Sequence, residues 1–302
     1  MQKKMSHVLL VLCFVFIAKP IKADETTERK SPWTFGFRAG IVNQLDTSIN
    51  DTGVDFSVTR SVVGGSVSYG WSRDVSAGIS IASTDNRYRY SGDATLGGLP
   101  LWHRIRERRL SLPIRLAPAP RTNLIVIPSI RSASEEGASY RAGQTEGMIL
   151  GASWTVSKRL SIGPGFGWFS ELDGGSSAFP IIVVDWKMTD RVTLATGRGL
   201  GAGRGPGLSL AYDFNEKWKL TSEIGIERYQ YVLDATDRIG EERSIPLTAS
   251  LDYAVGSATS FSIYGGVKWG GRFELIDETG ATLEQVKYDA APFIGVRLRA
   301  RI

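Results

Sequence analysis

Residues 293–302 read FIGVRLRARI, and this stretch decides the class of fold. Apolar and polar residues alternate in it, and a β-strand places alternate residues on opposite faces. One face carries Ile294, Val296, Leu298, Ala300 and Ile302, and the other carries Gly295, Arg297, Arg299 and Arg301. Three arginines on one face could not lie against hydrocarbon, where each would cost about 2 to 4 kcal/mol near the bilayer midplane. The stretch predicts a strand with one apolar face and one wet face.

The same alternation returns along the whole chain after its first residues. Near the start, Trp33, Phe35, Phe37, Ala39 and Ile41 oppose Thr34, Gly36, Arg38 and Gly40. Further segments with this pattern occupy residues 109–116, 160–168 and 244–253. A repeat of two residues is the signature of a strand, and no helical repeat explains it.

The connections between these segments also alternate, between short turns and longer loops. Short polar turns lie at 73–74, 119–121, 157–158, 189–190, 215–216 and 256–257, mostly flanked by aromatic residues, and longer loops are predicted at 43–54, 91–102, 134–143, 233–241 and 271–287. Short turns at one end and long loops at the other are typical of an outer-membrane barrel. We therefore predict an all-β fold, a single closed antiparallel transmembrane β-barrel of about fourteen strands, with twelve as the alternative. A soluble β-sandwich is disfavoured because its outward face should be mostly charged.

Residues 1–23 have the pattern of a signal peptide. Lys3 and Lys4 precede an apolar core at 8–18 that is too short to span a bilayer as a helix. Cleavage is expected after Ala23, with an uncleaved anchor as the alternative. The predicted domains are thus a signal peptide at 1–23 and a barrel at 24–302, exported to the cell outer membrane.

Charge and cysteine content narrow the function. The single cysteine, Cys13, lies in the leader, so disulfides and thiolate metal sites are not expected in the barrel. Four of the 36 basic residues are leader lysines, which leaves 32 basic against 31 acidic residues. A nearly neutral mature chain gives no support to nucleic-acid binding.

The residues that could carry catalysis or hold a metal are few. His103, the only histidine after the leader, has no identifiable serine partner for a lipid hydrolase and is expected to lie exposed in a loop. The pairs Asp234 with Asp237 and Glu241 with Glu242 fit no metal-site spacing and are predicted to be solvated loop charge.

A glycine-rich stretch at 197–207 invites comparison with nucleotide-binding loops. The dinucleotide fingerprint fails there, because Ala202 stands where glycine is needed and a strand follows instead of a helix. A hairpin loop is the better interpretation. The sequence therefore predicts neither an enzyme nor a cofactor.

The polar faces of the predicted strands carry charges that would point into the barrel. The basic members are Arg38, Arg109, Arg115, Arg131, Arg297, Arg299 and Arg301, and the acidic members are Asp185, Asp213, Glu223, Glu227 and Asp252. Closure would make the first and last strands neighbours, so a basic wall would face an acidic wall. Two alternatives stay open: a field across a passage that selects polar solutes, or ion pairs that plug the interior. Glycines at 163, 165 and 167 favour a passage.

Arg104, Arg106 and Arg108 form a second basic group, near a predicted loop. Guanidinium groups form paired hydrogen bonds with phosphate, so these residues, together with Arg198 and Arg204 of the glycine-rich stretch, are expected to contact lipopolysaccharide at the outer surface.

Taken together, the leader, the alternating strands and the last strand at 293–302 resemble a Gram-negative outer-membrane β-barrel, similar to poorly characterised barrel families of comparable length. The resemblance covers the mature chain. It implies outer-membrane lipid as surroundings and recognition of the last strand by the barrel-assembly machinery; such strands usually end in an aromatic residue, and this one ends in Ile302. The expected function is a porin-like passive channel for small polar or anionic solutes, with a homo-oligomer possible. The alternative is a non-transporting structural or adhesion barrel.

Overall fold

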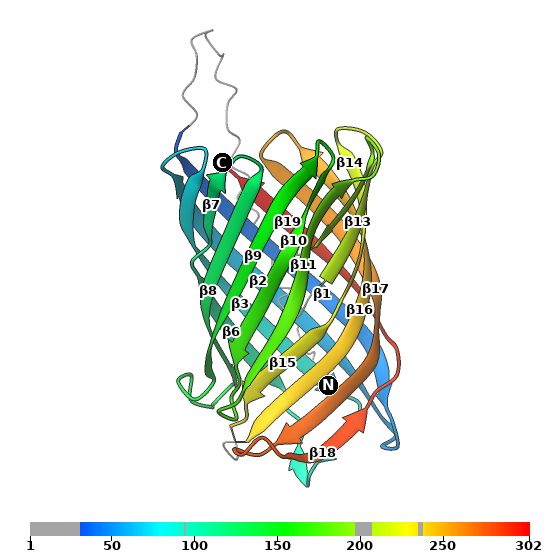
Figure 1. Cartoon of the computed structure of the whole chain (residues 1–302). Coiled ribbons are helices and arrows are strands. Elements are labelled where there is room, and N and C mark those ends of the chain that lie inside the picture. Colours follow the sequence, from blue (N-terminus) through cyan, green and yellow to red (C-terminus); the bar gives the residue numbers. More distant parts are fainter. Residues whose placement is uncertain (1–30, 94, 197–206, 235–237) are drawn as a thin grey trace. The chain divides into compact units, whose positions relative to one another are not determined.

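The computed structural model describes residues 31–93, 95–196, 207–234 and 238–302, and the part from Pro32 to Ile302 is a closed β-barrel (Figure 1). The first wall strands are β1 (Trp33–Ile49), β2 (Val54–Gly70), β3 (Val75–Tyr90), β6 (Arg104–Ser111), β7 (Ile114–Ala119), β8 (Thr122–Glu135), β9 (Gln144–Ser157) and β10 (Leu160–Ser170). They are followed by β11 (Ser176–Lys187), β12 (Val192–Thr196), β13 (Gly207–Asp213), β14 (Trp218–Gly225), β15 (Glu227–Val232), β16 (Ile239–Val255), β17 (Thr259–Ile276) and β19 (Ala291–Arg301). Three short strands lie in loops: β4 (Thr95–Leu96), β5 (Leu99–Pro100) and β18 (Thr282–Lys287).

The wall has fourteen strands, because β6 and β7 form one of them and β14 and β15 form another. β1 pairs with both β2 and β19, so the first and last strands close the ring, with Arg38 opposite Arg299. The predicted fold class and strand number are confirmed. Among the described residues, no helix is long and apolar enough to cross a membrane.

Proline explains one division of the wall. Pro113 stands between β6 and β7, where it cannot donate a ladder hydrogen bond. The prolines at 128, 164, 180 and 246 all lie within strands, which continue through them.

All six predicted short turns occur, and they lie at the same end of the barrel as the C-terminus, which we call the short-turn end (Figure 1). Several predicted loops at the other end, the long-loop end, are shorter than expected. Strand β1 continues to Ile49, β16 begins at Ile239 and β17 continues to Ile276. The polar residues in these segments led us to predict loops. The segments nevertheless contain side chains that are buried inside the barrel, and this burial supports strand pairing.

The outer face of the barrel is apolar over its middle. Exposed side chains on it include Phe35, Phe37, Ile79, Ile81, Leu110, Ile162, Phe166, Ile182, Leu247, Ile263, Ile294 and Val296. Aromatic rings pack against one another near the short turns, as Trp33 does against Tyr69 and Trp218 against Tyr253, with ring centres 4.8 and 4.7 Å apart. An apolar band edged by aromatic residues is the outer surface of a barrel that lies in lipid.

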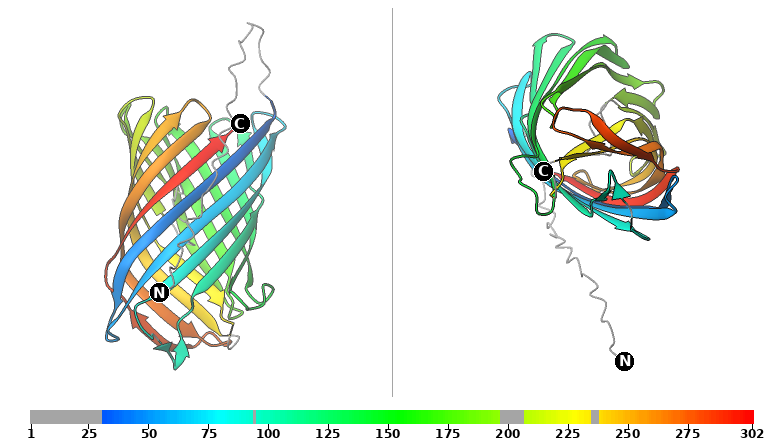
Figure 2. Two further views of the ribbon diagram at one scale, coloured as in Figure 1. Left: turned by 180° about the vertical axis from the view of Figure 1, so that it is seen from behind. Right: turned by 90° about the horizontal axis from the view of Figure 1, so that it is seen from below.

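The barrel is pinched at the long-loop end. At the short-turn end, strands β9 to β13 separate β8 from β14. At the other end β15 reaches β8 directly: Val232 forms a parallel bridge with Ser134, and Nη1 of Arg131 donates to the carbonyl oxygen of Gln230 at 3.0 Å. In the end-on view of Figure 2, the yellow and orange strands β15 to β18 cross the opening. The backbone thus narrows the interior at one end only.

Two predictions fall outside the described residues. The proposed signal peptide at 1–23 and most of the glycine-rich stretch at 197–207 are among them, so both stay predictions.

Candidate functional site

The interior of the long-loop half is filled by aromatic side chains. Trp102 lies at their centre, with its ring 5.0 Å from that of Tyr231 and 5.3 Å from that of Phe273. Phe56 joins them, its ring centre 5.0 Å from those of Phe273 and Tyr288. We call this buried group, with Tyr88, the aromatic plug.

A buried ion network adjoins the plug. Nη2 of Arg60 donates to both carboxylate oxygens of Glu242 at 2.7 Å, and the hydroxyl of Tyr88 donates to the same carboxylate at 2.6 Å. Nζ of Lys268 lies 3.6 Å from Glu242 and 3.1 Å from Glu227. Because buried charges are tolerated only when paired, this network fixes the strands that carry it.

The prediction that Glu241 and Glu242 are solvated loop charge is wrong. Both lie in β16 and are 0% and 1% exposed. Glu242 faces the interior, whereas Glu241 pairs with Arg228 at 2.8 Å. Of the other predicted pair, Asp237 lies outside the described residues. Within the described part of the chain, no group of three or more His, Cys, Asp or Glu side chains could hold a metal ion.

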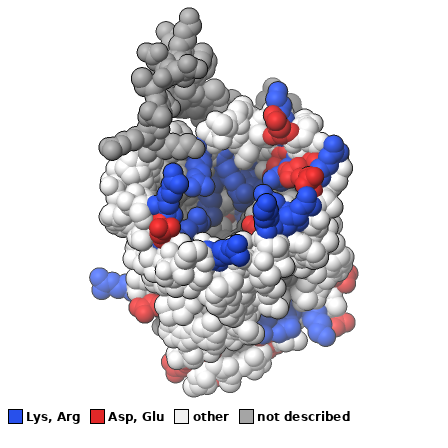
Figure 3. Space-filling view, turned by 45° about the horizontal axis from the view of Figure 1, so that its top comes forward, with Lys and Arg blue, Asp and Glu red and all other residues white. Residues whose placement is uncertain are grey.

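The interior of the short-turn half is open and polar. Cavities of about 720, 630 and 460 Å³ lie there, which we together call the vestibule. Figure 3 shows this end as a hollow with Lys and Arg side chains inside it and around its mouth.

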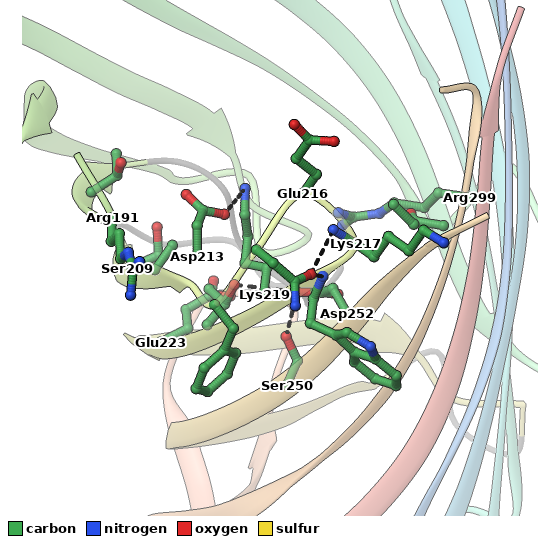
Figure 4. A pocket seen from close by; sticks show the side chains of 18 of the residues that line it. Arg191, Ser209, Asp213, Glu216, Lys217, Lys219, Glu223, Ser250, Asp252 and Arg299 are labelled. Atoms are coloured by element: carbon green, nitrogen blue, oxygen red, sulfur yellow. Dashed lines mark hydrogen bonds and ion pairs between the residues drawn. The ribbon is translucent and has the colours of Figure 1, made fainter. Parts of the chain in front are cut away.

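The side chains of the largest vestibule cavity come from β12, β13, β14, β16, β17 and β19 and from the short turns at 190–191 and 214–217 (Figure 4). Nζ of Lys219 lies 3.1 Å from Asp213, and the hydroxyl of Ser250 donates to Asp252 at 3.1 Å. Arg299 of β19 lines the same cavity. Charged and hydroxyl groups thus form much of the cavity wall, beside the rings of Phe214 and Trp218.

A smaller cavity of about 340 Å³ lies between the vestibule and the plug, and we call it the mid-barrel cavity. Arg297 and Arg299 line both it and the vestibule. Its other charged side chains are Arg38, Arg60, Glu223, Glu227 and Lys268.

The structure brings the predicted interior charges together on the inner face. Ten of them line the vestibule or the mid-barrel cavity: Arg38, Arg115, Asp185, Asp213, Glu223, Glu227, Asp252, Arg297, Arg299 and Arg301. The other two lie beside the plug, where Glu107 pairs with Arg131 at 2.8 Å and Arg109 at 2.9 Å. Open cavities lined by charged residues and buried ion pairs therefore occur in different halves of the barrel, and whether the open half forms a passage stays a prediction.

Four of these arginines have no acidic partner in the described part of the chain. No described carboxylate lies within the 4.0 Å ion-pair limit of Arg38, Arg115, Arg299 or Arg301. Arg297, in contrast, reaches Asp252 at 3.3 Å. The vestibule side nearest β1 and β19 therefore carries uncompensated positive charge.

The predicted lipopolysaccharide residues lie on the outer face of β6, near the long-loop end. Arg104 pairs with Asp85 at 2.8 Å and with Glu136 at 3.1 Å, and Arg106 also pairs with Glu136. The guanidinium of Arg108 lies over the ring of Tyr140, 5.2 Å from its centre.

Sequence reasoning missed the residues that build the plug and its ion network. Arg60 and Glu107 could have been found from alternation. Glu107 shares the inward face of β6 with the predicted Arg109, and Arg60 shares the inward face of β2 with Gly64, which pairs with the predicted Arg38. Trp102 could not, since it lies in a loop where no alternation assigns a face.

His103 is exposed, as predicted, and its ring lies 5.7 Å from that of Tyr90. It does not line any of the interior cavities described above, so it takes no part in the vestibule or the mid-barrel cavity.

Neither a family model nor a curated protein matches the chain. Solved structures do match. An outer membrane channel from Pseudomonas putida F1 is 11% identical with a TM-score of 0.51, over 94% of this chain and 100% of that one. The translocator domain of the autotransporter NalP from Neisseria meningitidis is 13% identical with a TM-score of 0.39, over 91% and 90%. The Pseudomonas putida toluene transporter TodX is 11% identical with a TM-score of 0.43, over 89% of each chain. At these identities the likeness establishes the fold alone, a β-barrel of the outer-membrane kind.

Proposed function

We propose that this protein is a passive outer-membrane channel for small polar solutes that favours anions. One observation carries the proposal: the short-turn half of the barrel encloses a wide polar vestibule whose β1–β19 side bears arginines without acidic partners among the described residues. Uncompensated charge in a confined pore raises the local concentration of the opposite ion. The name of the Pseudomonas putida channel agrees with this role.

We further propose that a signal peptide at 1–23 directs export of the chain, and that the barrel-assembly machinery inserts the barrel into the outer membrane. The apolar outer band supports a position in the outer membrane. We place the short turns in the periplasm and the long loops outside, as in other barrels of this kind. No catalytic role is proposed.

Planar-bilayer recording tests the channel. We expect stable unitary current steps. In a salt gradient, the reversal potential should shift toward the equilibrium potential of the anion. The double variant Arg115→Ala with Arg301→Ala removes two vestibule charges and should move the reversal potential toward zero. Its matched control, Arg73→Ala with Arg121→Ala, removes two exposed turn charges at the same end and should leave it in place. A cation-selective current would contradict the anion preference.

The aromatic plug favours a second candidate, a non-transporting barrel that anchors its loops for adhesion or envelope integrity. A plugged barrel would insert normally but carry no current. A silent protein that still migrates as a folded, heat-modifiable barrel would therefore support the anchor and remove the channel.

We also propose that Arg104, Arg106 and Arg108 bind lipopolysaccharide phosphates. Their support is their outward position on β6, beside the exposed Arg87 opposite Arg104. Replacing all three by alanine should weaken binding of the detergent-solubilised protein to immobilised lipopolysaccharide, and added salt should weaken the wild type similarly. Unchanged binding in the triple variant would remove this assignment.

A further inference from the structure

We infer that the mid-barrel cavity binds a small organic anion, a carboxylate with an apolar ring. This inference rests on the proposed function and names the substrate class. The cavity, of about 340 Å³, lies within the size range of pockets for small molecules. The cavity has two neighbouring positive charges, buried polar groups without partners, and an apolar wall. The charges and polar groups favour an anion, and the apolar wall favours an organic ring.

The positive charge comes first from Arg38 and Arg299. They stand directly opposite each other on β1 and β19, both facing the interior. Like charges at directly opposed positions destabilise a sheet. No described acidic side chain lies within ion-pair distance of either residue. A carboxylate between the two guanidinium groups would remove the repulsion and accept charge-assisted hydrogen bonds from both.

A glycine makes room for this arrangement. Gly64 of β2 faces Arg38, and a Cβ atom there would lie 3.0 Å from Nε of Arg38 and 2.9 Å from the carbonyl oxygen of Ile81. A larger residue would therefore crowd the Arg38 side chain. The position of Arg38 therefore depends on the absence of a side chain on the neighbouring strand.

Buried polar groups without partners mark the rest of the cavity. Gln44 is 4% exposed, and in the described structure neither its amide nitrogen nor its amide oxygen has a hydrogen-bond partner. Arg297 is 7% exposed, and its Nε and Nη1 atoms likewise have none. Buried polar groups are costly when they have no partner, and both residues line the cavity, so a ligand that reaches these groups would supply the missing partners.

The apolar wall favours an organic ligand over a purely inorganic one. Val42, Val58, Val62 and Phe293 line the cavity, together with the rings of Tyr229 and Tyr264. A hydrated ion such as phosphate gains nothing from these surfaces, whereas a ring buries apolar area against them. The cavity therefore favours an anion with an organic body.

Arg299 also provides the route to this cavity. It lines two vestibule cavities as well as the mid-barrel cavity. An anion entering from the short-turn end meets the unpaired vestibule arginines and then Arg299. Binding and entry thus use one continuous basic surface.

Calorimetric titration of the folded protein in detergent tests the inference, with sodium benzoate, benzamide and sodium phosphate as probes. Benzoate should bind saturably at one site, and both benzamide and phosphate about tenfold or more weakly, because each lacks either the charge or the ring. Arg38→Ala with Arg299→Ala should weaken benzoate about tenfold. Arg73→Ala, at an exposed short turn and outside the lining of the cavities described above, should change it by less than about twofold.

Each outcome has a defined meaning. Equal binding of benzoate and benzamide, or of benzoate and phosphate, overturns the inference, as does full binding by the double variant. If that variant does not fold as a heat-modifiable barrel, Val42→Trp, which fills the cavity and keeps both arginines, must abolish benzoate binding instead. An anion-selective current without benzoate binding overturns the inference alone. Benzoate binding by a folded but silent barrel supports the inference and overturns the channel.

Discussion

At the scale of single residues, Glu242 is the centre of the buried ion network. Glu242→Leu leaves Arg60 buried without its partner, and breaking a buried pair in this way costs about 3 to 5 kcal/mol. We expect the double variant Arg60→Met with Glu242→Leu to recover most of that loss, because no unpaired charge then remains between these two positions. Urea titrations in lipid vesicles measure both. A double variant as unstable as the sum of the two single variants would contradict the coupling.

Glu171, in the loop between β10 and β11, carries a prediction about pH. Burial alone would raise the pKa of this carboxyl, but the Arg228 guanidinium, with a hydrogen bond of 2.9 Å, holds the pKa below its usual value. A lowered pKa stabilises the fold fully above the unfolded value of about 4.3 and ceases to do so as pH falls through the folded value. The urea midpoint of the wild type should therefore drop more steeply in that acidic range than that of Glu171→Gln. Parallel profiles would rule out this contribution.

At the scale of elements, the loop between β3 and β6 closes the interior by inserting Trp102 into the plug. Trp102→Ala removes a ring that is 2% exposed and contacts Tyr231 and Phe273. We expect a loss of about 3 to 5 kcal/mol in stability and, if solutes pass through the plug, a larger unitary conductance. Planar-bilayer recording compares it with Trp154→Ala, which truncates an outward ring and should leave conductance unchanged. A folded Trp102→Ala protein with wild-type conductance would show that solutes do not pass this point.

Elements also mark the limit of what the sequence could predict. Alternation assigned the faces of β1 and β19 correctly, because neighbouring positions there meet different solvents. It failed at 239–242, where both faces of β16 are buried although the stretch carries the charged residues Glu241 and Glu242. The contact of β15 with β8 could not be predicted from the sequence either, because the two strands are far apart in the strand order of the wall.

At the scale of the whole molecule, the twelve predicted charges share one interior, but their surroundings differ along the barrel axis. The alternation of residues along a strand tells which side of the wall a residue faces. It does not tell how far along the barrel axis the residue lies. Arg131 and Arg301 both face the interior. Arg131 is nevertheless buried in an ion pair with Glu107, whereas Arg301 lines the open vestibule. The division into a wet half and a plugged half follows from the pinch at β8 and β15, which only the assembled barrel defines.

The orientation of the barrel gives a prediction for the molecule in its membrane. The only cysteine of the chain is Cys13, in the predicted leader, so single cysteines can be introduced without interference. Ser257 lies exposed in a short turn and Ser139 in a loop at the opposite end. Because barrels of this kind place short turns in the periplasm, an impermeant maleimide should label Ser139→Cys on intact cells and Ser257→Cys only after the outer membrane is permeabilised. The reverse pattern would invert the orientation, and solutes from outside would then meet the arginine-lined vestibule before the plug.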